Sequence, residues 1–252
     1  GPVVTLSRSI IVPFLQFSPR RDLRKNAYAA WAARGANGGD TDNRGIAGET
    51  LKLRETRAHL LGYPDFAHYK LETEMAGKPV AVRDLLMQVW EPAKAQAGKD
   101  ADILEKMLHA DGIDGPLEPW DWRYYSEQRR KVEHDLDEAV LKPYFQLDRM
   151  IDASFSCATR LFGLEFKPLD LPLYHDDCRV WEVTKDGVHI ALFIGDYFAR
   201  GSKRSGAWCS AMRAQARKPK AQTPIVVNVC NFAKQSEGKP ALLIYDDART
   251  LF

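Results

Sequence analysis

A short polar segment between residues 175 and 182 holds the first groups in this sequence that could do chemistry. Four of its side chains could act as general acids or bases in a hydrolase: His175, Asp176, Asp177 and Glu182. His175 and Cys178 could also contribute two metal ligands, although a zinc site in a protein needs three or four. Strand-like alternation places Glu182 on the face opposite Trp181, where a salt bridge explains it more simply than catalysis does. We therefore favour a structural role for this segment and expect no metal site in it.

A basic stretch follows the polar segment. No Asp or Glu occurs between Tyr197 and Ser236, where the cations are Arg200, Lys203, Arg204, Arg213, Arg217, Lys218, Lys220 and Lys234. Such a stretch could attract nucleic acid, draw the carboxylates of peptides toward a cleft, or form a solvated loop balanced by acids elsewhere, which we favour. The whole chain has 36 Lys and Arg against 34 Asp and Glu, a formal net charge of +2. We therefore expect no nucleic-acid partner.

Four aromatic residues lie close together near the start of a predicted helix: Trp120, Trp122, Tyr124 and Tyr125. They could stack on bases, but aromatic residues so closely spaced at a helix start more often pack against another helix, the interpretation that we favour. The sequence contains no G-x-S-x-G motif, P-loop or dinucleotide fingerprint. None of these features identifies a reaction by itself.

The four cysteines bear on the compartment. They stand at positions 157, 178, 209 and 230 and never form a C-x-x-C pair. This spacing fits buried or free thiols in a reducing compartment better than a disulfide framework, so we expect a cytoplasmic location. The chain has no run of about 18 apolar residues, and we expect no membrane span.

Hydrophobic periodicity predicts helices over the first two thirds of the chain. Apolar residues at three-to-four spacing indicate helices over residues 20–34, 46–61, 65–75, 79–109, 119–135 and 137–161. Pro92 should bend the long helix over 79–109 without ending it, because the apolar pattern continues beyond the proline. Lys142 and Pro143 should break or kink the last helix.

The pattern changes near Gly163. Residues 179–183 and 188–194 predict two strands joined by a tight Asp186-Gly187 turn, and residues 224–229 and 241–244 predict two more. A last helix, capped by Asp246 or Asp247, is expected over 248–252. The predicted fold class is α+β, mainly helical, with a small antiparallel sheet in the C-terminal third. We divide the chain into a helical part, residues 1–165, and a sheet part, residues 166–252, of one truncated domain.

Several strings of residues are long enough to carry a family resemblance: YHDDCRVWEV at 174–183, DYFAR at 196–200 and KRSGAW at 203–208. Together they resemble the thimet-oligopeptidase-like family of zinc metallopeptidases. PWDWRYY at 119–125, DLDE at 135–138 and LKPYF at 141–145 are most similar to its bacterial peptidyl-dipeptidase branch. The resemblance runs in order over essentially the whole chain.

The resemblance implies a zinc peptidase whose catalytic motif lies beyond this chain. In that family Leu-Phe is followed by H-E-x-x-H, in which two histidines bind zinc and the glutamate activates the metal-bound water. Here Leu251 and Phe252 are the last residues. We therefore expect a middle fragment of a zinc-dependent peptidyl-dipeptidase that releases C-terminal dipeptides from short peptides. Zinc is expected in the longer protein and not in this fragment, which should be inactive by itself and hold no catalytic or metal-ligating residue.

The resemblance also implies a substrate-binding segment. In related helical zinc peptidases, such as angiotensin-converting enzyme, a strand of small residues with an Ala-Trp step lies beside the metal and pairs with extended peptide. The residues similar to that strand are Ser205, Gly206, Ala207 and Trp208. Small residues let a peptide backbone approach to hydrogen-bonding distance. The alternative is a loop in which Gly206 merely permits a turn.

Two other functions stay open. An oligopeptide endopeptidase of the same family would share these features, because the groups that recognise the C-terminus of the substrate are expected outside this chain. A non-catalytic module that binds peptides, or acts as a scaffold, would use the same fold without the zinc motif. A fragment of either kind should expose large apolar patches, which predicts association with itself or with a partner.

Overall fold

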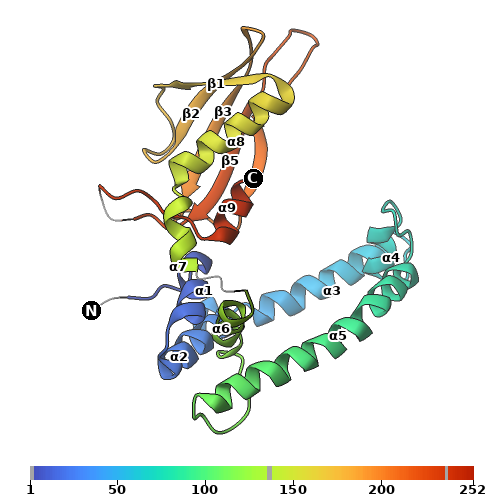
Figure 1. The fold of residues 1–252 in the computed structure, drawn as a ribbon. Helices are drawn as coiled ribbons and strands as arrows, with labels where there is room; N and C mark the ends of the chain where they lie inside the picture. The colour runs from blue at the N-terminus through green and yellow to red at the C-terminus, as the bar shows by residue number, and fades with distance from the viewer. Residues whose placement is uncertain (1–2, 135–137, 236–237) are drawn as a thin grey trace.

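The protein, described here by a computed structural model over residues 3–134, 138–235 and 238–252, has a helical N-terminal part and a sheet in its C-terminal part (Figure 1). The helices are α1 (Arg8–Phe17), α2 (Arg21–Ala32), η1 (Gly39–Thr41), α3 (Arg44–Leu60), α4 (Phe66–Leu71), α5 (Pro79–Ala110), α6 (Trp122–His134), α7 (Glu138–Leu141), η2 (Lys142–Tyr144), α8 (Leu147–Phe162) and α9 (Tyr245–Leu251). The strands are β1 (Leu164–Leu169), β2 (Arg179–Lys185), β3 (Val188–Phe198), β4 (Trp208–Arg213) and β5 (Ile225–Phe232). This order confirms the α+β class.

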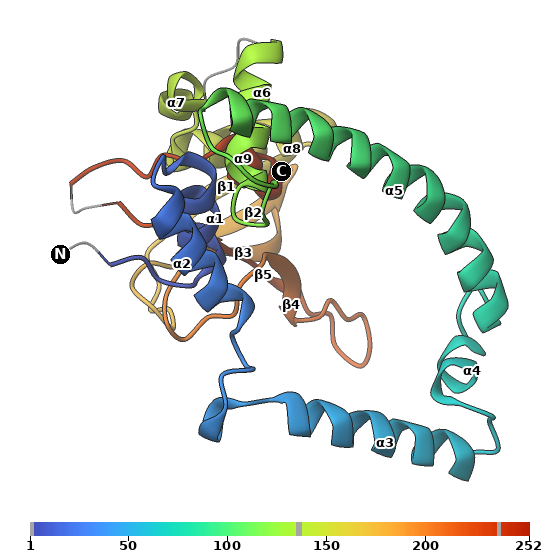
Figure 2. The ribbon, with the colours of Figure 1, turned by 90° about the horizontal axis from the view of Figure 1, so that it is seen from below.

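The predicted helices form close to their expected positions. Pro79 occupies the first turn of α5, where its missing N–H costs nothing. Pro92 lies inside α5, which continues past it and curves along its length (Figure 2). The predicted break at Lys142 and Pro143 is also confirmed, because α7, η2 and α8 replace one continuous helix. The expected boundaries at residues 135 and 137 lie outside the described residues.

Helices α3, α4 and α5 extend away from the rest of the molecule as an arm, which both views show (Figures 1 and 2). Large apolar side chains on the arm are exposed: Ile46, Leu51, Leu53, Leu60, Leu61, Val80, Leu85, Leu86, Met87, Val89 and Trp90. The far half of α5 differs, since Leu104 and Leu108 are buried against Tyr125 of α6. The apolar stripe that predicted α3 and the first half of α5 therefore contacts solvent in this chain.

The sheet has the strand order β1-β2-β3-β5-β4. The neighbouring strands are antiparallel except β3 and β5, which are parallel, so the expectation of a purely antiparallel sheet is wrong for that pair. The cause is the path of the chain, which leaves β3, forms β4 at the far edge and returns as β5 between them. The Asp186-Gly187 turn between β2 and β3 is confirmed, with φ of 52° and 75°, the positive values that a tight hairpin turn requires.

Each face of the sheet covers its own apolar cluster. Trp181, Tyr197 and Cys230 lie on the face that packs against helices α8 and α9. Val180, Ile194 and Val227 lie on the other face, against Leu173 and Cys178 of the segment before β2. Successive strand residues point alternately into the two clusters, so strands with both faces covered appear in the sequence as nearly continuous apolar runs.

The C-terminal segment differs from its prediction in two places. Residues 241–244 do not form a fourth strand: Leu147 N donates to Ala241 O at 2.9 Å and Leu243 N to Phe145 O at 2.8 Å, so this segment pairs with the residues before α8. Helix α9 begins at Tyr245, earlier than expected. Asp247 still helps to cap it, because its Oδ2 accepts from Ile244 N at 3.5 Å.

Candidate functional site

Strand β4 is an exposed edge of the sheet. It pairs with β5 on one side and is the last strand in the order, and all six of its residues are exposed. An edge strand leaves alternate backbone N–H and C=O groups free to pair with another chain, and proteins usually blunt such edges. Here the edge carries Trp208 and Met212, whose residues are 53% and 60% exposed. These features are typical of an edge that receives an extended peptide.

The four residues singled out in the sequence lie at the entry to this edge. Trp208 is the first residue of β4, whereas Ser205, Gly206 and Ala207 belong to the loop that precedes it. Gly206 has φ of 101°, a value that side chains rarely allow. A Cβ at Gly206 would meet no atom of the described residues within 4 Å, so the backbone conformation, and not crowding by those residues, explains the glycine. Of the four residues, Trp208 therefore lies in a strand and the other three lie in a loop, and their role toward a substrate stays a prediction.

A buried acid, Asp196, organises the loop between β3 and β4. Its carboxylate is 2% exposed and accepts from Arg200 Nη1 and Nη2 at 2.7 and 2.8 Å, from Lys203 Nζ at 3.1 Å and from Tyr174 Oη at 3.0 Å. Burial alone would raise the pKa of Asp196, but these hydrogen bonds outweigh burial and lower its pKa to about 2. The Asp196 carboxylate is therefore charged at neutral pH and fixed by its donors, so it is not available as a general base.

The side chains of the polar segment at 175–182 make hydrogen bonds within the chain. Glu182 Oε1 lies 3.0 Å from His189 Nδ1 on the neighbouring strand β3. His175 Nδ1 accepts from Asp177 N at 3.1 Å, and burial raises the pKa of the Cys178 thiol, which disfavours the thiolate that metals bind. Within the described residues, no three His, Cys, Asp or Glu side chains gather in an arrangement that could hold a metal ion. The described part of this chain therefore offers no site that fits zinc.

The aromatic segment at 120–125 also packs between helices. Trp120 contacts Tyr28 of α2 edge to face, at 6.4 Å between ring centroids, and the Arg24 guanidinium lies 4.2 Å from the centroid of Tyr124. Asp121 is fully buried and accepts from Arg24 Nη2 at 2.9 Å. These contacts join α2 to α6, so the packing interpretation is supported.

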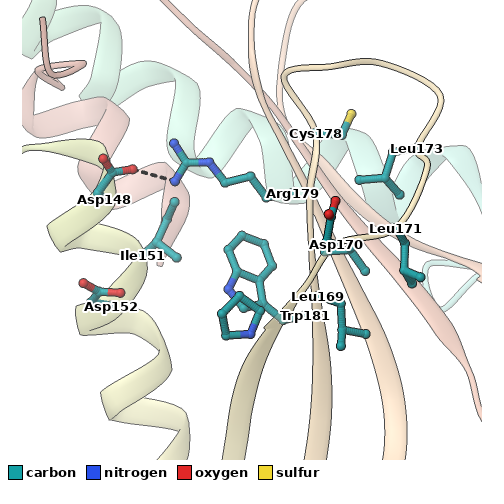
Figure 3. A pocket seen from close by; sticks show the side chains of 12 residues that line it. Asp148, Ile151, Asp152, Leu169, Asp170, Leu171, Leu173, Cys178, Arg179 and Trp181 are labelled. Atoms are coloured by element: carbon teal, nitrogen blue, oxygen red, sulfur yellow. Dashed lines mark hydrogen bonds and ion pairs between the residues drawn. The ribbon is translucent and has the colours of Figure 1, made fainter. Parts of the chain in front are cut away.

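A cavity of about 420 Å³ lies between α8 and the start of β2 (Figure 3). Trp181 and Ile151 form its apolar wall, and Asp148, Asp152 and Asp170 lie around it. The one arginine that lines it, Arg179, points toward Asp148 and forms an ion pair with it. Strands β3 and β5 separate this cavity from β4, so it is not part of the exposed edge.

Comparison with known proteins decides the family. Residues 14–252 match the pattern of peptidase family M3. The chain belongs to peptidase family M3. It is 38% identical to dipeptidyl carboxypeptidase of Salmonella typhimurium and 37% identical to that of Escherichia coli, in each case over 92% of this chain and 34% of the relative. It is 33% identical to oligopeptidase A of Escherichia coli over 100% of this chain and 38% of that protein.

The M3 chain described here thus spans about a third of the length of these relatives. All four of its cysteines are free: Cys178 and Cys230 are buried, and Cys157 and Cys209 are exposed. None of the described helices combines the length and apolar character that a membrane crossing needs. The resemblance inferred from the sequence strings is therefore confirmed at the level of the family.

Helix α9 packs against β5, the strand beside the M3 candidate edge. Leu251 of α9 belongs to the same buried cluster as Cys230 and Phe232 of β5, and β5 is the direct neighbour of β4. Figure 1 shows α9 beside the sheet on the face that α8 also covers. The C-terminal helix of this chain is thereby anchored one strand away from the exposed edge.

Proposed function

We propose that this chain is part of a zinc-dependent peptidyl-dipeptidase that hydrolyses short peptides and releases dipeptides from their C-termini. The observation that carries the proposal is the exposed edge strand β4 in an M3 peptidase whose similar relatives include two dipeptidyl carboxypeptidases. Zinc, held by residues outside the described part of this chain, would supply the activated water. The chain itself supplies the surface that orients the peptide.

The orienting step follows from the geometry of an edge. A peptide that lies along β4 as an added strand forms backbone hydrogen bonds that do not depend on its side chains, which suits a peptidase with varied substrates. A strand of six residues turns at most about three of them outward for such bonds, because the pattern alternates. Short peptides can therefore use the whole edge. Ala207 and Ser210 keep the approach open, and Trp208 can cover a substrate side chain.

The substitution Gly206→Val tests the edge in the full-length protein. Valine at φ of 101° forces the loop to rearrange, so we expect peptide turnover to fall at least about tenfold, the effect of roughly one or two lost hydrogen bonds. Gly48→Val is the matched control: Gly48 lies in α3 and has no positive φ, and an added Cβ there would meet none of the described residues outside its own helix backbone within 4 Å. Equal rates of peptide turnover for the two variants would show that β4 and its entry loop are not part of the substrate site.

Oligopeptide endopeptidase activity is the second candidate, since oligopeptidase A proteins are also similar to this chain. The two activities differ in their need for a free C-terminal carboxylate. We expect the full-length protein to cut a hexapeptide with a free C-terminus two residues from that end and to cut its C-terminal amide far more slowly. Equal rates on both peptides, or internal cleavage, would favour the endopeptidase.

A non-catalytic peptide-binding or scaffolding module is the third candidate. The full-length protein should hold one zinc ion per chain and lose its peptidase activity with a chelator. The 252-residue chain should hold no stoichiometric zinc and should not cleave peptides, because no three His, Cys, Asp or Glu side chains gather into a metal site among the described residues. Metal analysis that found one zinc per 252-residue chain, together with activity, would contradict this assignment, and a zinc-free full-length protein that binds peptides would favour the module.

The surroundings of the protein are part of the proposal. Four free cysteines suit a reducing compartment, and we infer a cytoplasmic location. Short peptides are the proposed partners, and nucleic acid is not among them, because Arg200, Lys203 and Lys234 of the basic stretch form ion pairs within the chain. The exposed apolar residues of the α3–α5 arm lead us to expect that the 252-residue chain associates with itself.

A further inference from the structure

A buried lysine ties the loop between β3 and β4 to two strands at once. Lys203 Nζ donates to Asp196 O at 3.0 Å, to Phe198 O at 2.7 Å and to Cys230 O, in addition to the Asp196 carboxylate. The Lys203 side chain is only 7% exposed. An ammonium group has three donors, and burying it without partners is costly. The four oxygens around Nζ therefore compensate for its burial and hold it in one place.

A second side chain holds the same loop closer to β4. Asn231, on β5, donates through Nδ2 to Arg204 O at 2.8 Å and to Gly206 O at 2.7 Å. These two carbonyl groups flank Ser205. Lys203 and Asn231 thus attach successive parts of the loop to the ends of β3 and β5. The hydrogen bonds extend as far as Gly206, two residues before β4 begins.

The fixed loop determines where the exposed edge begins. Beyond the loop, β4 is held by its ladder with β5 and, at its far end, by hydrogen bonds from the Arg213 side chain to Thr223. All six residues of β4 are exposed. A strand with no buried side chain has little to hold it except its backbone hydrogen bonds, and frays easily at its ends. A peptide binds more tightly when the edge strand is already ordered, because ordering a loose strand on binding costs conformational entropy and lowers the affinity for the peptide.

We propose that Lys203 and Asn231 are positioning residues for peptide binding, which lock the loop before β4 so that the edge strand is ready to pair with an extended substrate. This inference rests on the proposed function of β4. Neither residue needs to contact the reacting atoms. Their loss should therefore raise KM for peptides and leave kcat nearly unchanged, because an ordered strand is required for binding, and the chemistry follows once the peptide is bound.

The experiment uses the full-length, metal-loaded protein and the variants Asn231→Asp and Lys203→Met. Asn231→Asp keeps the size of the side chain but turns a donor into an acceptor that faces two carbonyl groups. Asn231 is only partly buried, so Asn231→Asp should fold. It therefore still tests the inference if Lys203→Met, which leaves the buried Asp196 carboxylate without one of its cations, fails to fold. Lys185→Met is the control: Lys185 is exposed at the end of β2, away from β4.

Two readouts separate positioning from general destabilisation. We expect KM to rise about tenfold in Asn231→Asp, the effect of roughly one or two lost backbone hydrogen bonds, with kcat within about twofold of the parent and Lys185→Met unchanged. Hydrogen exchange of the β4 amides should slow when the parent protein binds an alanine hexapeptide whose bond two residues from the C-terminus is reduced to CH₂–NH. That protection should be lost in Asn231→Asp, while the amides of β2 and β3 exchange as in the parent.

Each outcome has one meaning. Protection of β4 in the parent and equally in Asn231→Asp, with unchanged KM, would overturn the positioning role and leave the edge assignment intact. No protection of β4 by the hexapeptide in the parent would instead refute the proposed function of β4. A fall in kcat with unchanged KM would also overturn the inference, because it would place the residues in the chemical step.

Discussion

A single added methyl group at Gly195 should destabilise the sheet severely. Gly195 and Tyr197 are on the same face of β3, and the Tyr197 ring folds back over Gly195. An ideal Cβ at position 195 would lie less than 3.0 Å from Cε2, Cζ and Oη of Tyr197. Tyr197 is 1% exposed and packed in the cluster beneath α8, so its ring cannot swing into solvent. Either the ring or the strand must move.

The expected magnitude follows from known costs of overpacking. Forcing an extra carbon into a packed core costs about 1–3 kcal/mol, so Gly195→Ala should lower the free energy of unfolding by about 2 kcal/mol. Tyr197→Leu alone should also cost about 2 kcal/mol, because it leaves a cavity. Leucine is too short to reach over position 195. The double variant should therefore be about 2 kcal/mol more stable than the sum of the single effects predicts.

The free energy of unfolding is measured in urea, by tryptophan fluorescence and far-ultraviolet circular dichroism, for the parent, the two single variants and the double variant of this double-mutant cycle. Gly201→Ala is the matched control, because Gly201 has no positive φ and an added Cβ there would meet none of the described atoms within 4 Å. That control should stay within about 0.5 kcal/mol of the parent. Additive effects of the two β3 substitutions, or a Gly195→Ala variant as stable as the control, would refute the argument that the Tyr197 ring occupies the space beside Gly195.

Three further predictions concern charge and exposed surface. Asp121→Ala leaves the buried Arg24 guanidinium without its carboxylate and should cost about 3–5 kcal/mol in urea unfolding, whereas Asp22→Ala, at an exposed ion pair, should leave the unfolding midpoint unchanged. Hydrogen bonds from Arg200, Lys203 and Tyr174 lower the pKa of Asp196 to about 2, so the charged carboxylate stabilises the fold at pH values above its unfolded-state pKa of about 4. On the order of 2 kcal/mol of the free energy of unfolding should be lost as the pH falls from about 4 to 2. An Asp196→Asn variant should not show this part of the loss when unfolding is measured as a function of pH. The 252-residue chain should sediment as an oligomer in analytical ultracentrifugation and shift toward monomer when Leu86 and Trp90 of the arm are both changed to Ser; a monomeric parent chain would contradict the role given to these apolar residues.

Sequence patterns predicted the elements whose signals are local. Helices α2, α3 and α5 follow from apolar residues three to four apart, and the β2–β3 hairpin follows from Asp186-Gly187, since few other pairs accept two positive φ values. The same patterns missed β4, because all of its residues are exposed and no alternation between a buried and an exposed face exists to be detected. The sequence patterns also do not predict strand β1. It contains Pro168, and a proline weakens the prediction of a strand although edge strands such as β1 tolerate one.

The segment at 241–244 shows the opposite error. Its apolar residues gave the signal of a buried strand, and Leu243 is indeed buried, at 1% exposure. Burial, however, does not determine the partner of a segment. The chain satisfies the backbone of this segment with Phe145 and Leu147, about a hundred residues earlier, and no local pattern carries that information. The parallel pairing of β3 with β5 was missed for the same reason.

The candidate site was predictable only where a family resemblance supplied it. The resemblance points to four residues: Ser205, Gly206, Ala207 and Trp208. In the structure they lie at the entry to an edge strand, whose substrate role stays a prediction. Asn231 was not identified, because an asparagine that follows a cysteine in a strand carries no signal that its amide reaches back to a loop 25 and 27 residues away.

Within the basic stretch between Tyr197 and Ser236, two groups of three cations differ in their surroundings. Arg200, Lys203 and Lys234 form ion pairs with Asp196 and Asp177, so their positive charge is balanced within the fold. Other members, Arg217, Lys218 and Lys220, lie exposed on the hairpin between β4 and β5, at the end of the edge opposite Gly206. A peptide added to β4 would therefore lie between a loop locked by a buried lysine and a cationic hairpin. If β4 receives peptides as proposed, this charge distribution would favour an extended ligand with negative charge at one end, such as a peptide with a free carboxyl terminus.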